Sequence, residues 1–185
     1  PTAIPQTRVT VSEESAIIDV VKKVGPAVVT VINTLPPQTG LFGATQPEAR
    51  GSGVIVDKTG YIITNNHVVE NQQSLEVIFA DGSKATAHLI GADPYVDTAV
   101  IKVDGAVPAT AELGDSSALV VGQQVFAIGN PFGQMWTMTS GIVSAVGRTI
   151  HSGTSNYSIP EVVQTDASIN PGNSGGPLLD SQGRV

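Results

Sequence analysis

A serine stands in a glycine-rich turn near the end of this 185-residue sequence, in the run Asn-Pro-Gly-Asn-Ser-Gly-Gly-Pro at 170–177. Glycine tolerates positive φ angles and leaves neighbouring backbone N–H groups accessible. A nucleophilic serine needs both properties, because its hydroxyl must be exposed and the N–H groups of Gly172 and Ser174 must converge on the oxyanion formed during attack on a carbonyl. The run therefore indicates acyl-transfer chemistry at Ser174, although a glycine-rich loop that merely contains a serine has the same pattern.

A serine hydroxyl also needs a base, and histidine is the side chain best suited to proton transfer near neutral pH. The sequence has three histidines. His67 directly follows a predicted strand, where a short turn can aim it at a cleft, whereas His88 lies within a strand pattern and His151 in a polar loop. We predict that His67 is the base and His88 is structural, while His151 lies on the loop surface or lines a cleft.

The base in turn needs a carboxylate that fixes its tautomer and stabilises the imidazolium. Asp97 begins an alternating apolar strand, where burial without a partner would be costly, and pairing with a histidine removes that cost. Asp93, Asp166 and Asp180 fit turns or loops better, although Asp166 could brace the serine loop. Asp97 is therefore the predicted partner of His67.

The surrounding sequence predicts an all-β protein with one short helix. Val, Ile and Thr recur in short runs between turns, and the chain contains 20 Gly and 12 Pro. A helix capped by Ser12 is predicted to end at Gly25-Pro26. About six strands follow between residues 27 and 103, interrupted by a loop at 35–50, and four more lie between 124 and 180. The spacing of the first six strands is typical of a small β-barrel.

These patterns divide the chain into four predicted parts. They are an N-terminal segment with the helix (1–26), a first β-barrel (27–103), a linker (104–121) and a second β-barrel (122–185). The second barrel has fewer strands, and its last turn leads into a strand that is not present, so we expect it to be incomplete at the C-terminus. His67 and Asp97 fall on the first barrel and Ser174 on the second, in the chain order of chymotrypsin-type barrels. The site should then lie between the two barrels.

Composition argues against several classes of protein. The formal net charge is −7 and the nine Lys and Arg residues form no stripe, which argues against a nucleic-acid partner. No run of 18 apolar residues occurs, so no membrane span is predicted. Cysteine is absent, which excludes disulfides and thiolate chemistry. The sequence holds no metal-ligand cluster and no phosphate-binding loop, so we expect no metal and no cofactor.

Six motifs resemble those of the HtrA/Deg (high-temperature-requirement) serine proteases. In chain order they are GSGVI at 51–55, TNNHVV at 64–69, DTAV at 97–100, AIGNPFG at 127–133, SGIVS at 140–144, and QTDA at 164–167 continuing through GNSGGPL at 172–178. The resemblance runs from about residue 12 to the end. It implies a chymotrypsin-like double β-barrel, which the family usually follows with one or two PDZ domains; no PDZ domain is expected within these residues. It also implies an ATP-independent quality-control endopeptidase, often trimeric and in some members also a chaperone.

The resemblance assigns a role to each motif residue. It implies that His67 is the general base, Asp97 its orienting acid and Ser174 the nucleophile, with an oxyanion hole formed by the amides of Gly172, Asn173 and Ser174.

By the same analogy Ser168 and Ile169 line the substrate pocket. Neither is charged, which favours small or medium aliphatic side chains before the scissile bond. The segment 149–157 stands at the position of a regulatory loop, and Phe132, Trp136 and Met138 are expected to pack in the barrel.

The sequence therefore predicts a serine endopeptidase that cleaves unfolded or misfolded polypeptides. The alternative is a non-catalytic polypeptide-binding or chaperone module, or an inactive fragment of a protease. An esterase is a weaker option, because Pro177 and a strand follow the serine where an esterase would have a helix, and because histidine precedes aspartate in the chain. The resemblance also implies a homotrimer, for which residues 1–26 would form the contact. We expect a location in the bacterial periplasm or cell envelope, with mitochondrion or chloroplast as alternatives.

Overall fold

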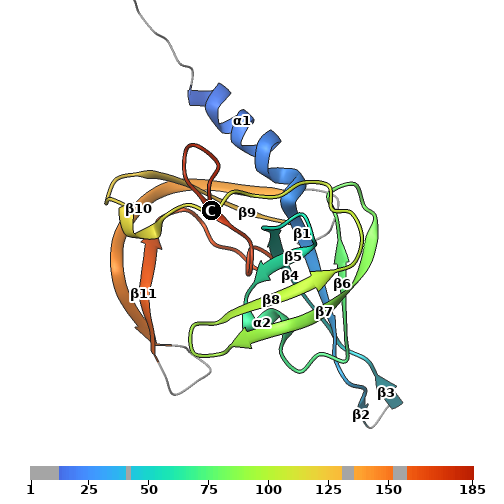
Figure 1. The fold of residues 1–185 in the computed structure, drawn as a ribbon. Coiled ribbons are helices and arrows are strands. Elements are labelled where there is room, and N and C mark those ends of the chain that lie inside the picture. The colour runs from blue at the N-terminus through green and yellow to red at the C-terminus, as the bar shows by residue number, and fades with distance from the viewer. Residues whose placement is uncertain (1–12, 41–42, 131–135, 152–157) are drawn as a thin grey trace, which may run out of the picture.

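A closed barrel and an open, curled sheet lie side by side in the computed structural model, which describes residues 13–40, 43–130, 136–151 and 158–185 (Figure 1). The barrel contains six strands: β1 (Val28–Thr34), β4 (Glu48–Ile55), β5 (Tyr61–Thr64), β6 (Ser74–Ile78), β7 (Lys84–Asp93) and β8 (Thr98–Val103). Their order around the barrel is β1-β4-β5-β8-β7-β6, and pairing of β1 with β6 closes it. All of these pairs are antiparallel.

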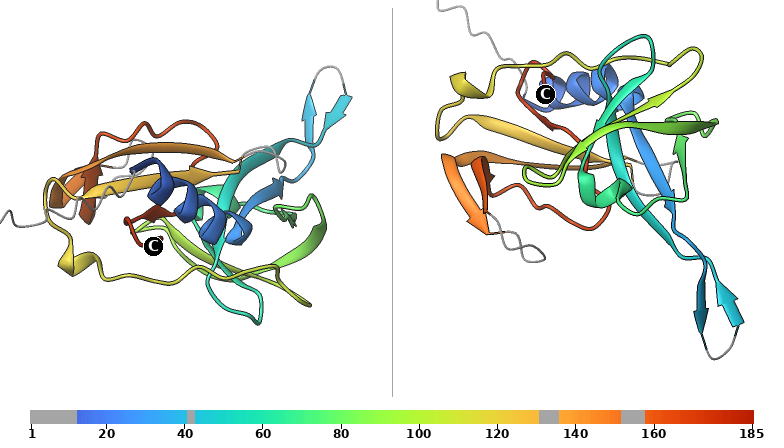
Figure 2. Two further views of the ribbon diagram at one scale, coloured as in Figure 1. Left: turned by 90° about the horizontal axis from the view of Figure 1, so that it is seen from above. Right: turned by 60° about the horizontal axis from the view of Figure 1, so that its bottom comes forward.

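The second sheet has four strands in the order β11-β10-β9-β12. They are β9 (Gln124–Gly129), β10 (Thr137–His151), β11 (Ser158–Thr165) and β12 (Leu178–Leu179). The predicted fold class is confirmed: an all-β, chymotrypsin-like double-barrel architecture with a short N-terminal helix, in which the second half is curled but not closed (Figure 2). The boundaries of the four predicted parts stay predictions.

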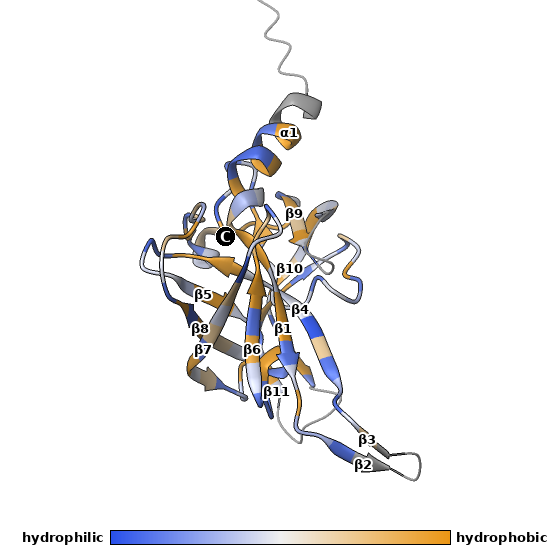
Figure 3. Ribbon diagram, turned by 90° about the vertical axis from the view of Figure 1, so that its right-hand side faces the viewer, coloured by the Kyte–Doolittle hydropathy of each residue, from blue (hydrophilic) through white to orange (hydrophobic). Residues whose placement is uncertain are grey.

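The two halves share one apolar core. In β8 the buried residues alternate with more exposed ones, and Ala99, Ile101 and Val103 face the barrel interior. Phe126 and Leu179 of the second sheet belong to the same buried cluster as these side chains. Figure 3 shows apolar segments running along the barrel strands and β9. The strands that carry the predicted site residues are therefore fixed by a continuous core.

The region predicted as a loop at 35–50 contains regular structure, and that prediction is wrong there. It holds β2 (Gln38–Gly40), β3 (Gly43–Thr45) and the first three residues of β4. β2 and β3 pair as an antiparallel ribbon that projects from the barrel (Figure 2). The ribbon sequence is rich in Gly, Gln and Thr, so it lacks the apolar alternation by which a strand is recognised.

The N-terminal helix α1 (Glu13–Val24) is confirmed at the predicted residues, whereas its proposed cap, Ser12, lies outside the described residues. A turn of 3₁₀-helix, η1 (Gly25–Ala27), joins it to β1. α1 buries Val20 and Val24. No helix in the described part of the chain is long and apolar enough to cross a lipid bilayer.

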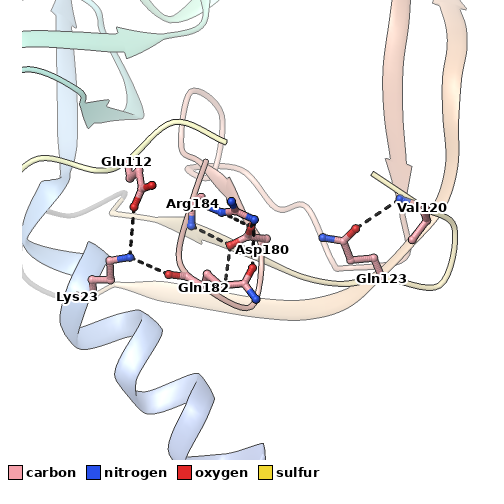
Figure 4. Close-up of polar contacts among 7 residues, drawn as sticks. All are labelled: Lys23, Glu112, Val120, Gln123, Asp180, Gln182 and Arg184. Carbon is pink, nitrogen blue, oxygen red and sulfur yellow. Dashed lines mark hydrogen bonds and ion pairs between the residues drawn. The ribbon is translucent and has the colours of Figure 1, made fainter. Parts of the chain in front are cut away.

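The last turn of the chain packs against the end of α1 through a network centred on Asp180 (Figure 4). One carboxylate oxygen, Oδ1, accepts the amides of Gln182 and Arg184, both at 2.9 Å. The other, Oδ2, lies 2.8 Å from Arg184 Nε and 2.7 Å from its Nη2. Lys23 Nζ of α1 donates to Gln182 O at 2.8 Å. Asp180 is only 8% exposed, so this predicted turn acid lies at the centre of a partly buried network.

This network makes stability depend on pH. Burial alone would raise the pKa of Asp180, but the hydrogen bonds from Arg184 and Gln182, with the charge of Arg184, hold that pKa below its ordinary value. The ionised carboxylate therefore stabilises the folded state above about pH 4, the ordinary aspartate pKa, and this contribution is lost as the pH falls through the lower folded pKa. We expect Asp180→Asn to reduce the free energy of unfolding by about 1 to 2 kcal/mol at pH 7.

Urea unfolding of the unchanged chain and of Asp180→Asn at pH 7 and at acid pH tests this expectation. The difference between the two proteins should shrink below about pH 4. Asp19→Asn, a change of an exposed acid on α1, is the matched control and should show little effect at either pH. A difference for Asp180→Asn that stays constant with pH would contradict the role given to its charge.

Candidate active site

His67 lies on α2 (Asn66–Val69), a single helical turn that begins directly after β5. The sequence predicts a short turn here, and the structure makes that turn helical. Asn33, a fully buried residue of β1, holds the end of α2: its Nδ2 donates to Val68 O at 3.0 Å and to Glu70 O at 2.9 Å. The element that carries His67 is thus anchored to the barrel, while the His67 side chain itself is exposed.

Asp97 precedes β8 and contacts His67 twice. Its Oδ2 lies 2.6 Å from Nδ1 of the His67 ring, and its Oδ1 accepts the His67 backbone N–H at 2.9 Å. Asp97 has a φ of +52°, in the left-handed region that Asp and Asn tolerate better than most residues. This uncommon backbone conformation accompanies a carboxylate that fixes both the ring and the backbone of His67.

The contact at Nδ1 determines which ring nitrogen is available. When Nδ1 carries the hydrogen and donates it to the Asp97 carboxylate, Nε2 keeps a free lone pair. An imidazole held in this tautomer can accept a proton from a hydroxyl on its Nε2 side. In the described residues Ser174 Oγ makes no hydrogen bond to His67; such contacts often tighten only when substrate binds.

The residues before Ser174 form a type II turn. The Asn173 amide donates to Asn170 O at 3.0 Å, and Gly172 has a φ of +100°. A type II turn favours proline at its second position, here Pro171, and requires a residue with positive φ at its third, which glycine supplies. The spacing of Pro171 and Gly172 thus explains the local backbone.

All but two of the backbone N–H and C=O groups described next, in residues 172–174, take part in hydrogen bonds. The carbonyl of Gly172 accepts Ser52 Oγ at 2.6 Å, that of Ser174 accepts Ser52 N at 2.7 Å, and that of Asn173 accepts Gly176 N at 2.8 Å. The Asn173 amide is used by the turn. Among the described residues, the amides of Gly172 and Ser174 donate to no acceptor. These two N–H groups are therefore the ones free to bind an oxyanion.

Ser52, from β4, links the barrel to this loop. It is fully buried, and its Oγ also accepts the Asn130 amide at 2.8 Å. The loop approaches β4 so closely that a Cβ added at Gly175 would lie 2.2 Å from Ser52 O, and Gly175 has a φ of +81°. Only glycine fits this position.

The side chain of Asn65, from the first barrel, contacts both the serine loop and Asp97. Asn65 Oδ1 accepts the Gly175 amide at 2.6 Å, and its Nδ2 donates to Asp97 O at 2.7 Å. Residues predicted on separate strand sets are thereby joined: the acid Asp97, the helix that carries His67, and the loop of Ser174. The catalytic role of each stays a prediction.

The residues predicted for the substrate pocket lie just before the type II turn. Ser168 is exposed and its carbonyl accepts Thr139 Oγ1 at 2.8 Å, while Ile169 is 60% exposed. Asp166 Oδ1 accepts the Ile142 amide at 2.7 Å, which ties β10 to the segment leading to the turn. That contact agrees with a bracing role for Asp166.

The other histidines contact surface groups away from Asp97. His88 Nε2 lies 4.0 Å from Asp104 Oδ2, and His151 Nδ1 lies 2.8 Å from Ser158 Oγ. Both histidine side chains are exposed. These contacts fit surface roles for the two residues.

The three residues expected to pack in the barrel differ in what the structure describes. Met138 packs against the core, and Trp136 lies against Gly25, with ring atoms 3.0 Å from a Cβ built there. Phe132 and most of the segment 149–157 lie outside the described residues.

A cavity of about 440 Å³ borders the end of the serine loop. Thr64, Asn65, Gly175 and Gly176 are among its lining residues, but His67 and Ser174 are not. It therefore does not coincide with the predicted catalytic groups. In the described ranges no group of three or more His, Cys, Asp or Glu side chains is arranged to hold a metal ion.

Three contributors to the site were not assigned from the sequence: Asn33, Ser52 and Asn65. Each is a polar residue within or directly after an apolar strand pattern. Their only sequence signal is that a buried polar side chain must find a partner, and the identity of that partner depends on tertiary structure.

Comparison with known proteins gives consistent matches. The profile of the trypsin-like peptidase domain matches residues 51–185. The serine protease Do-like HtrA of Bacillus subtilis (strain 168) is 44% identical in an alignment of 188 positions that covers 94% of this chain and 42% of the relative. A probable periplasmic serine endoprotease DegP-like of Pseudomonas putida is 49% identical over 145 residues, covering 77% of this chain and 30% of the relative. This chain thus spans less than half the length of either relative.

The crystal structure of Deg5 superimposes with a TM-score of 0.76 and 38% identity, over 94% of this chain and 83% of that one. The fold and the sequence identity over most of the Deg5 chain agree with the matches to the relatives. The chain therefore belongs to the trypsin-like peptidases and, within them, to the HtrA/Deg serine proteases.

Proposed function

We propose that this chain forms the catalytic part of a serine endopeptidase with Ser174 as nucleophile, His67 as general base and Asp97 as the acid that orients His67. The observation that carries the proposal is the double contact of the Asp97 carboxylate with the ring Nδ1 and the backbone amide of His67. With its hydrogen on Nδ1, the His67 ring can accept a proton on Nε2. This is the tautomer that the reaction requires.

The reaction then proceeds in two stages. Ser174 Oγ bonds to the scissile carbonyl carbon while its proton passes to His67 Nε2, and the oxyanion accepts the amides of Gly172 and Ser174. The C–N bond breaks as His67 returns the proton to the leaving amine. Water then attacks the acyl-enzyme by the same proton relay and releases Ser174. We restrict the hole to two amides, because the Asn173 amide is used in the turn.

The substrate that we propose is an unfolded or misfolded polypeptide. His67, Ser168 and Ile169 are exposed, so an extended chain can reach them, and the uncharged pocket residues favour small or medium aliphatic side chains before the scissile bond. Degradation of a denatured protein but not of its folded form would support this assignment. Equal degradation of both would overturn it.

The family membership supports a proposal on the location and the assembly of the protein. We propose a periplasmic or cell-envelope location, in agreement with the name of the Pseudomonas relative. We also propose a homotrimer with contacts through residues 1–26. Sedimentation that detects only monomer would contradict the trimer, and fractionation that places the protein in the cytoplasm would contradict the location.

Labelling with a fluorophosphonate probe tests the proposed nucleophile, because the probe reacts with an activated serine and not with an ordinary one. We expect the chain to be labelled and Ser174→Ala to remain unlabelled. Ser181→Ala, a change of an exposed serine in the last turn, is the matched control and should be labelled normally. An unlabelled but folded chain would contradict the proposal and favour the polypeptide-binding module.

A further inference from the structure

We infer that Asn65 is a positioning residue that holds the nucleophile loop and the triad acid in register across the two halves of the molecule. The inference rests on the proposed function. Its basis is a single carboxamide that makes two tertiary hydrogen bonds, donating from Nδ2 to Asp97 O at 2.7 Å and accepting the Gly175 amide on Oδ1 at 2.6 Å.

The local position of Asn65 would favour a different use of its side chain. It is the N-cap residue of α2, with φ −85° and ψ 150°, where an asparagine ordinarily accepts an amide of its own helix. No such capping hydrogen bond is present. The side chain instead points away from the helix to Asp97 and Gly175, so the local interaction is replaced by two long-range ones.

Asn65 controls the peptide that directly follows the nucleophile. The Ser174 carbonyl is held by the Ser52 amide at 2.7 Å, and the N–H of the same peptide, on Gly175, is held by Asn65. A peptide fixed on both edges cannot rotate, and this restricts the position of the Ser174 Cα and the direction of its Oγ.

The other hydrogen bond acts on the acid. Asp97 has a left-handed backbone, and its carbonyl accepts both Asn65 Nδ2 and the Asn66 amide, the latter at 3.2 Å. A carboxamide combines a donor and an acceptor in one rigid plane. Aspartate at position 65 would keep an acceptor for Gly175 but lose the donor to Asp97, and alanine would lose both.

Loss of this link should affect the rate of reaction at Ser174 more than the amount of folded protein. A displacement of about 1 Å at a reacting group can slow a reaction about 100-fold. We therefore expect Asn65→Ala and Asn65→Asp to lower the rate constant of fluorophosphonate labelling by about that factor. The labelled fraction at completion should stay unchanged.

Asn66→Ala is the matched control. Asn66 is the adjacent asparagine, its side chain makes no hydrogen bond in the described residues, and its amide remains in the alanine variant. It should react at the rate of the unchanged chain. A merely structural role for Asn65 predicts the opposite pattern to ours, a reduced labelled fraction with an unchanged rate constant, and that result would overturn the inference.

Amide hydrogen exchange provides a readout that does not depend on activity. Exchange at Gly175 should accelerate in Asn65→Ala and not in Asn66→Ala, whereas exchange at Ile101 in the barrel should not change. If the unchanged chain is unlabelled while exchange behaves in this way, the proposed function fails and the link through Asn65 stands. Unaltered exchange at Gly175 would overturn the inference whatever the labelling shows.

Discussion

Replacement of His67 by alanine is expected to lower kcat about 10⁶-fold, because the hydroxyl of Ser174 loses the group that accepts its proton. No other histidine is placed to substitute for it, since His88 and His151 contact Asp104 and Ser158 elsewhere on the surface. The residual rate should be that supplied by substrate binding and the oxyanion hole.

The measurement is hydrolysis of an unfolded protein substrate, with thermal unfolding recorded in parallel. The His67 side chain is exposed and α2 is held by Asn33, so the variant should fold. His88→Ala is the matched control, because it also removes an exposed histidine side chain, and it should keep full activity. Substantial hydrolysis by His67→Ala would exclude it as the base.

Much of the fold is predictable from the sequence because burial and strand periodicity coincide. In β8 the sequence predicts the alternation of Ala99, Ile101 and Val103 with more exposed residues, and the structure shows it. The β2–β3 ribbon cannot be predicted in this way, because it projects from the barrel and its sequence has no apolar alternation. Periodicity detects strands that bury a face and not those stabilised mainly by pairing.

The candidate site, like the fold, has some features that the sequence predicts and others that it does not. Pro171 and Gly172 predict a turn before Ser174, and the acid before β8 predicts a partner for His67, because both are local consequences of residue type. The engagement of the Asn173 amide within the turn is not predictable, since it depends on the direction of each peptide group. The contacts of Ser52 with Gly172 and of Asn65 with Gly175 join residues more than 100 positions apart, and no local pattern encodes them.

The second large effect is expected from Asp97→Asn, which should lower kcat about 10⁴-fold. Asparagine tolerates the left-handed φ of +52°, so the backbone should be preserved and the effect confined to the side chain. A carboxamide that still accepts the His67 amide on Oδ1 directs its NH₂ group at Nδ1. The ring must then carry its hydrogen on Nε2, and in that tautomer it cannot accept the proton of Ser174.

Steady-state hydrolysis tests this prediction, with kcat expected to fall and KM to change little. Asp93→Asn is the matched control, because Asp93 is an exposed acid at the end of β7 that accepts the Tyr95 amide at 2.8 Å. Normal turnover by Asp97→Asn would exclude Asp97 as the partner of His67.

Combining substitutions distinguishes the two ways in which Asp97 is connected to the site. Its carboxylate acts through His67, so Asp97→Asn should cost nothing further once His67 has been replaced by alanine. Asn65 contacts the Asp97 carbonyl and not the carboxylate, and that carbonyl is kept in Asp97→Asn. Asn65→Ala should therefore slow the Asp97→Asn variant further, because the contact that fixes Gly175 is lost in either background. The added effect should be smaller than in the unchanged chain, because the part that acts through the position of Asp97 has already been lost. No further loss in the double variant would mean that Asn65 acts on the reaction only through Asp97 and not through the nucleophile loop.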